Sequence, residues 1–181
     1  MQRFLIAHSD DSVMLGYVVA AAVGRPLNEY FSEKIWIPLG AEDDAYWSVD
    51  MGRNVVGSSG FTARLRDWAR LAGMLANNGR WDGRQVVPEK WVLEMTTPNR
   101  AFPHLLPGAS EYLGYGYQTW LFPAKRRFAL LGVFGQGIFI DPETKTSLVM
   151  TGAWDEPADP KHKGPDRIEF FAGLVNRIAR W

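Results

Sequence analysis

The feature that most constrains the fold is a pair of apolar runs separated by a short polar turn. Residues 128–140 and 146–151 are rich in apolar, aromatic and β-branched side chains, and such runs are typical of β-strands. Between them lie residues 141–145, where Pro142 fixes its φ angle for a tight bend. The pattern predicts an antiparallel hairpin, and other parts of the chain must cover its apolar side chains.

A further strand is expected just before this hairpin, over residues 112–122. The run is aromatic and apolar, and Gly114 and Gly116 would allow close approach of a neighbouring backbone. Its aromatic side chains have two interpretations: a packed sheet face, or a groove that binds an apolar or amide substrate. The groove would be lined by Tyr112, Tyr115, Tyr117 and Trp120.

The remaining sequence has helical periodicity. Four helices are expected before residue 105, and a fifth opens at Pro165 with an apolar face suited to cover the sheet. We therefore predict an α+β fold in one domain, residues 1–181, mainly helical over 1–105 and consisting of antiparallel strands plus a C-terminal helix over 106–181. The first four helices are expected to follow residues 9–11 and end at Gly24, to run from Pro26 to Pro38, from Thr62 to Asn77, and from Pro88 to Thr97.

Composition limits the functional classes. Twenty Lys and Arg balance twenty Asp and Glu, so the chain has no basic surplus for nucleic acid. There is no cysteine, which excludes disulfides, thiolate catalysis and Cys-based zinc sites. No run is long and apolar enough to cross a membrane, and the first ten residues lack a signal-peptide core. We expect a cytoplasmic protein with no metal, cofactor, nucleic acid or membrane partner.

Self-contained catalytic motifs are absent from the sequence. No Ser is followed three residues later by Lys; Ser32 and Lys34 are only two apart, which places them on different helix faces. Residues 57–60, Gly-Ser-Ser-Gly, have the wrong spacing for a nucleophile elbow, and we interpret them as a turn. His8 and Ser9 could form a base and nucleophile only through an unusual turn, because adjacent side chains of an extended chain point to opposite faces.

Several short motifs nevertheless follow one another in a recognisable order. The motifs are residues 11–17 (DSVMLGY), 24–27 (GRPL), 35–40 (IWIPLG), 60–70 (GFTARLRDWAR), 78–83 (NGRWDG), 115–120 (YGYQTW), 132–136 (GVFGQ) and 140–142 (IDP). Together they resemble the segment after the second catalytic motif of class C β-lactamase-like serine hydrolases. Glycine followed by glutamine at 135–136, and Ala-Trp after the hairpin, resemble most the esterase and 6-aminohexanoate-dimer hydrolase branch of that family.

The resemblance implies a partial β-lactamase/transpeptidase-like fold and half of an active site. Members of the family use a Ser and a Lys three apart on a helix, a Tyr that assists proton transfer, and a backbone amide that stabilises the oxyanion. In this chain Ser9 matches the third position of the second motif, whereas Ala7 replaces its Tyr. Gly132 matches the glycine of the third motif, and Val133 would donate the oxyanion amide. Gly135 and Gln136 would help to bind substrate.

Three functional hypotheses follow. The first is a β-lactamase-related hydrolase fragment or subunit, inactive alone, which a companion N-terminal segment completes for a small amide or ester substrate. The second is a non-catalytic binding or oligomerisation module, such as a homodimer, because a three-stranded sheet would leave an open edge and an uncovered apolar face. The third is a weak esterase that uses Ser9.

Overall fold

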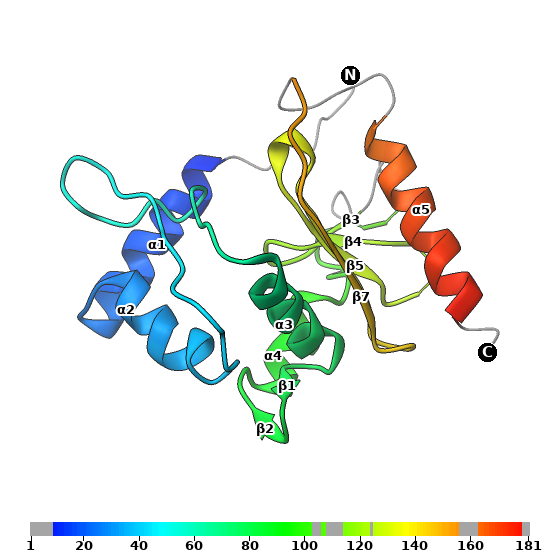
Figure 1. The fold of residues 1–181 in the computed structure, drawn as a ribbon, viewed down its shortest axis with the longest axis horizontal. Coiled ribbons are helices and arrows are strands. Elements are labelled where there is room, and N and C mark those ends of the chain that lie inside the picture. The colour runs from blue at the N-terminus through cyan, green and yellow to red at the C-terminus, as the bar shows by residue number, and fades with distance from the viewer. Residues whose placement is uncertain (1–8, 103–105, 108–113, 124, 156–162, 179–181) are drawn as a thin grey trace. The chain divides into compact units, whose positions relative to one another are not determined.

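A computed structural model describes residues 9–102, 106–107, 114–123, 125–155 and 163–178 (Figure 1). The chain divides into two compact units, Met1–Trp68 and Ala69–Trp181, which are described separately. Helices precede an antiparallel sheet, and a last helix follows it, so the predicted α+β class is confirmed. That residues 1–181 form one domain stays a prediction.

The first unit begins with the helical part that the sequence predicts. Helix α1 (Ser9–Val23) is followed by Gly24 at φ 68°, a left-handed conformation that glycine adopts without strain and that ends helices. Helix α2 (Leu27–Phe31) continues into a π-helical segment, η1 (Ser32–Trp36). The expected boundaries at Pro26 and Pro38 are close to those observed, but periodicity gave no sign of the π-helix.

A cluster of aromatic rings forms the centre of this unit. The ring of Phe61 meets four others nearly edge-on, at centroid distances of 5.0 to 5.4 Å. Edge-to-face packing aligns the positive edge of one ring with the negative face of another. Two of the indole N–H groups also have acceptors, since Trp36 donates to the carbonyl of Asp43 and Trp47 to that of Val56. The four rings around Phe61 are Phe31, Trp36, Trp47 and Trp68.

Two helices and a small hairpin precede the main sheet. Helix α3 (Leu65–Ala76) begins three residues later than predicted, because Thr62 does not cap it but forms a bridge with Tyr46. The short strands β1 (Arg80–Trp81) and β2 (Arg84–Gln85) form a tight hairpin that the secondary-structure prediction missed. Helix α4 (Glu89–Met95) agrees with the expected helix after Pro88.

Within the described residues the main sheet has five antiparallel strands in sequence order, not the three expected. The predicted strand over residues 112–122 is a hairpin, β3 (Gly114–Tyr115) and β4 (Trp120–Leu121), because the chain turns between them with Gln118 at φ 56°. The predicted strand over residues 128–140 is also two strands, β5 (Phe128–Leu131) and β6 (Gly137–Asp141). Strand β7 (Thr146–Met150) completes the predicted hairpin with β6.

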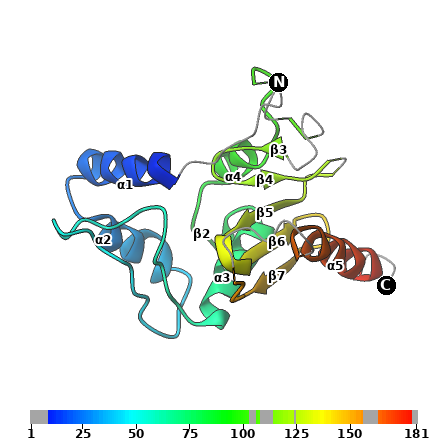
Figure 2. The ribbon, with the colours of Figure 1, turned by 90° about the horizontal axis from the view of Figure 1, so that it is seen from above.

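The register of the sheet places alternate residues on two apolar faces. On one face Ala129 and Phe139 pack with Phe171 and Val175 of α5 (Lys163–Ile178), all fully buried. On the other face lie the alternate side chains Phe128 and Ile140, which are also fully buried. Figures 1 and 2 show α5 on one side of the sheet and α3 and α4 on the other. The predicted C-terminal helix packed on the sheet is therefore confirmed.

The same register decides which turns share an end of the sheet. Trp120 pairs with Ala129 and Leu131 with Gly137, so the β3–β4 turn and the β5–β6 turn lie at one end. The β4–β5 and β6–β7 turns lie at the opposite end. Among the helices of the described residues, none is long and apolar enough to be a candidate membrane span.

Candidate active site at the β5–β6 turn

The turn between β5 and β6 contains four of the nine site residues that the sequence predicts, Gly132, Val133, Gly135 and Gln136. Gly132 donates its amide to the carbonyl of Gln136 at 3.1 Å and closes the turn. Inside it, η3 (Val133–Gly135) makes one short 3-10 turn. The side chains of Val133 and Phe134 are 59% and 39% exposed. The turn thus presents backbone and apolar side chains at the end of an otherwise buried strand.

The backbone of this turn is strained at one residue. Phe134 has φ 60° and ψ 21°, the left-handed conformation, which costs a side chain with a Cβ about 1 to 2 kcal/mol. Gly135 follows at φ 97°, which glycine tolerates. Non-glycine residues stay in this conformation only where the surroundings hold them there, and such residues concentrate at functional sites.

The segment after β7 packs against the strained turn. The amide of Trp154 donates to the carbonyl of Phe134 at 3.1 Å. The Trp154 ring lies so close to Gly135 that a Cβ there would come within 2.6 Å of the indole nitrogen. The side-chain amide of Gln136 donates to the carbonyl of Gly152 at 3.3 Å. Gly135 is therefore required for two reasons, its φ angle and the close approach of Trp154.

Helix α5 adds a cation to the same cluster. Arg167 donates from NH1 to the carbonyl of Gln136 at 2.9 Å, and its guanidinium lies 4.4 Å from the centroid of the Trp154 ring. Burial lowers the pKa of Arg167 below its usual value. Sequence reasoning missed this residue, because nothing local links a helical arginine to a turn 31 positions earlier.

The predicted aromatic residues divide between core and surface. Trp120 packs against the core under α5, and Tyr115 meets its ring edge-on at 5.0 Å. Tyr117 is 49% exposed in the β3–β4 turn, and the centroid of its ring lies 5.3 Å from that of Trp91. Tyr112 lies outside the described residues. The packed-face interpretation therefore holds for Trp120, whereas Tyr117 lies at the same end of the sheet as Val133.

The second-motif remnant belongs to the other compact unit. Ser9 is the first residue of α1, but its side chain, like His8 and Ala7, lies outside what the structure describes. The other two histidines, His104 and His162, also fall outside it. Residues 57–60 contain a turn, as predicted, in which Ser59 donates its amide to the carbonyl of Val56. In the described part of the chain no group of three metal-ligating side chains occurs.

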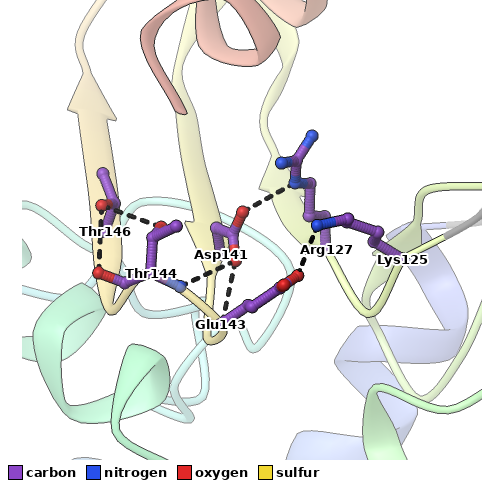
Figure 3. A network of polar contacts seen from close by, with 6 residues as sticks. All are labelled: Lys125, Arg127, Asp141, Glu143, Thr144 and Thr146. Carbon is purple, nitrogen blue, oxygen red and sulfur yellow. Dashed lines mark hydrogen bonds and ion pairs between the residues drawn. The ribbon is translucent and has the colours of Figure 1, made fainter. Parts of the chain in front are cut away.

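At the opposite end of the sheet, polar and charged groups form a network of hydrogen bonds and ion pairs with one another. Asp141 is 1% exposed, forms an ion pair with Arg127 at 2.7 Å, and accepts the amides of Glu143 and Thr144 (Figure 3). Lys125 pairs with Glu143 at the surface. A shallow depression of about 180 Å³ lies over this network. Because its charged groups are paired with one another, we interpret it as a fold-stabilising cluster.

Arg126 ties the same end of the sheet to the preceding helices. Its guanidinium donates to Thr96 at 3.0 Å and to Asn78 at 2.6 Å, so one side chain joins the ends of α3 and α4. Burial lowers the pKa of Arg126 below its usual value. Three consecutive basic residues, 125–127, are therefore occupied in internal contacts and do not form an anion site.

Comparison with known proteins gives the family. The Beta-lactamase family matches residues 8–172, most of the chain. A curated relative, 6-aminohexanoate-dimer hydrolase of Paenarthrobacter ureafaciens, is 26% identical over 162 residues, which are 85% of this chain and 40% of that protein. The chain therefore spans less than half the length of this relative.

Solved structures share the fold. A Bacillus anthracis protein with a provisional assignment as 6-aminohexanoate-dimer hydrolase superposes with a TM-score of 0.81 at 24% identity, over 97% of this chain and 44% of that one. A β-lactamase from Mycobacterium bovis superposes with a TM-score of 0.61 at 23% identity, over 81% and 56%. The resemblance seen in the sequence is confirmed, and this chain belongs to the β-lactamase family.

Proposed function

We propose that this chain supplies the oxyanion-stabilising half of a serine hydrolase that cleaves a small amide or ester. In this proposal the amide of Val133 donates a hydrogen bond to the oxygen that becomes negative in the transition state. Preorganised donors of this kind contribute the largest electrostatic part of acyl-transfer catalysis. The exposed β3–β4 turn, with Tyr117, lines the substrate side together with Gly135 and Gln136.

The single observation that carries this proposal is the strained turn at Val133–Gly135. It presents backbone at the end of a buried strand, and a left-handed Phe134 and a tryptophan packed on Gly135 fix its shape. An oxyanion donor must be held rigidly before the reaction, because reorientation during the reaction would cost the energy that the donor provides. The name of the Paenarthrobacter ureafaciens relative supports an amide substrate.

The nucleophile of the proposed reaction comes from a segment outside these 181 residues. The chain contains no Ser-x-x-Lys, and without this pair acyl transfer has neither its nucleophile nor its adjacent base. We propose that a companion N-terminal segment, or a longer polypeptide of which this chain is part, supplies the pair. A cytoplasmic location stays a prediction.

Two described surfaces suit such a companion. Strand β7 is the last strand in the sheet order and has one neighbour, β6, among the described residues. Its sequence, Thr-Ser-Leu-Val-Met, carries no proline or charge that would discourage pairing with another strand. On α1, Met14, Leu15 and Val18 are 49 to 60% exposed. These surfaces are also what favours the second candidate, a non-catalytic module that forms a homodimer.

The test is the chemistry of the purified chain itself. We expect no hydrolysis of a p-nitrophenyl ester or a chromogenic β-lactam and no covalent labelling by a serine-directed phosphonate, as read by mass spectrometry. Labelling of a serine with turnover would contradict the proposal and name the nucleophile, and its loss in Ser9→Ala would establish the third hypothesis. A stable symmetric dimer by light scattering would favour the binding module.

A further inference from the structure

The β5–β6 turn is held by two residues that are remote in sequence and meet each other in space. Arg167 comes from α5, and Trp154 comes from the segment after β7. The guanidinium of Arg167 lies over the Trp154 ring at 4.4 Å and also donates to the carbonyl of Gln136 at 2.9 Å. Trp154 in turn donates its amide to Phe134 at 3.1 Å. The turn, the tryptophan and the arginine therefore form one closed set of contacts.

The turn needs such contacts because the sheet does not hold it. Ladder pairing between β5 and β6 stops at Leu131 and Gly137, so residues 133–135 have no strand partner there. Phe134 is in a left-handed conformation, which a residue with a side chain leaves unless its neighbours prevent this. Outside residues donate hydrogen bonds to two carbonyls of the turn, Trp154 to that of Phe134 and Arg167 to that of Gln136.

The geometry at Arg167 suits a stacking role. The Nε atom of its guanidinium is buried and has no hydrogen-bond partner among the described residues. Burying an unpaired donor is unfavourable, so the position of the group is explained by its other contacts, the indole face and the Gln136 carbonyl. A planar guanidinium can make both contacts at once, whereas an ammonium cannot stack in this way.

We infer that Arg167 and Trp154 are positioning residues, which fix the β5–β6 turn and thereby the direction of the Val133 amide. They do not touch the reacting atoms; they act through Gln136 and Phe134. The inference rests on the proposed function only for its catalytic consequence. The contacts of Arg167 and Trp154 with the turn are a property of this chain, and they can be tested without measuring activity.

The first test measures amide hydrogen exchange in the 181-residue chain by NMR. The amides of Gly132 and Trp154 report on the turn, because both donate into it, and the amides of Phe139 and Leu148 report on the sheet. In Arg167→Ala we expect exchange at Gly132 and Trp154 to rise at least tenfold, with Phe139 and Leu148 changed less than twofold. Arg177→Ala, an exposed arginine in the last turn of the same helix, is the matched control and should change neither pair.

Arg167→Lys separates stacking from charge. Because lysine keeps the positive charge but loses the planar group, we expect it to behave like Arg167→Ala at the turn amides. Equal acceleration of turn and sheet amides in Arg167→Ala would mean general destabilisation and would overturn the inference. Unchanged turn amides, or full protection restored by lysine, would overturn it as well.

The catalytic consequence is tested in a completed enzyme, in which this chain replaces the corresponding part of the Paenarthrobacter ureafaciens relative. We expect Arg167→Ala to lower kcat about tenfold and to change KM less than twofold, since positioning acts on the transition state. An unchanged kcat would remove the catalytic role. If Val133→Pro, which deletes the amide, also leaves kcat unchanged, the proposed function is contradicted. The role of Arg167 and Trp154 in fixing the turn, which is measured in the isolated chain, is not affected by that result.

Discussion

Strand β6 joins two turns that are stabilised in different ways. The β6–β7 turn, residues 141–145, is stabilised in part by its own residues, since Asp141 accepts the amides of Glu143 and Thr144; Asp141 also pairs with Arg127, which immediately precedes β5. The β5–β6 turn is held by residues 16 to 31 positions away, at Gly152, Trp154 and Arg167. One turn stabilises the sheet, and the other depends on the sheet and on α5 for its shape.

The difference indicates where function lies in this chain. The β6–β7 turn also has a residue in the left-handed conformation, Lys145 at φ 53°, but Asp141 accepts two amides from within the turn itself. At the β5–β6 turn the left-handed Phe134 is contacted instead from a distant segment, by Trp154, and Val133 is left exposed. Strain held by distant contacts is typical of sites where a backbone group must point in a fixed direction. The following predictions test this comparison, from the largest expected effect to the smallest.

Removing the buried carboxylate of the β6–β7 turn should have the largest effect. Asp141→Ala removes the ion-pair partner of Arg127, whose side chain is only 14% exposed, and it leaves the amides of Glu143 and Thr144 without their acceptor. Breaking a buried pair in this way costs about 3 kcal/mol or more of the free energy of unfolding. Urea unfolding of the wild-type and Asp141→Ala chains measures this loss in the free energy of unfolding. A loss below about 1 kcal/mol would mean that this turn does not stabilise the sheet as described.

A methyl group at Gly135 should strain the β5–β6 turn. Gly135→Ala adds a side chain at φ 97° and places it against the Trp154 ring, so we expect a loss of about 2 kcal/mol in the free energy of unfolding. Gly132→Ala is the matched control. Gly132 has φ −95°, which any residue adopts, and its new Cβ would lie 3.2 Å from the Cβ and Oε1 of Gln136, so the loss should be smaller, below about 1 kcal/mol. Equal losses at both glycines would break the comparison.

The local character of the β6–β7 turn predicts a modest effect at its proline. Pro142→Ala frees one φ angle in the unfolded chain and should lower the free energy of unfolding by about 0.5 kcal/mol. Thermal unfolding detects this as a small drop in Tm. The amide exchange of Gly132, in the other turn, should stay unchanged. Faster exchange there would show that the two turns are coupled.

The exposed pair at the same turn should matter least. Lys125 and Glu143 are 50% and 64% exposed, and exposed pairs contribute between zero and about 1 kcal/mol. Lys125→Ala should therefore change the free energy of unfolding by less than about 0.5 kcal/mol, and the effect should vanish in high salt. A larger effect would require Lys125 to act beyond its pair with Glu143.

The same comparison explains what the sequence could predict. The β6–β7 hairpin was predicted correctly because its signals, a proline and an aspartate between two apolar runs, are adjacent in the chain. The turns at Gln118 and Phe134 were missed, and two predicted strands proved to be four, because residues 116–119 and 132–136 contain no proline, asparagine or aspartate to indicate a turn. Val133 and Gly132 were placed by resemblance, whereas Arg167 was missed because its contacts span 31 residues.

The most direct test of the central claim is the turnover of the completed enzyme with and without the Val133 amide. The chimaera that joins this chain to the N-terminal part of the Paenarthrobacter ureafaciens relative should hydrolyse a p-nitrophenyl ester. In Val133→Pro we expect kcat to fall about a hundredfold or more, as when an oxyanion donor is lost, and KM to change little. An active chimaera whose kcat is unaffected by Val133→Pro would contradict the account.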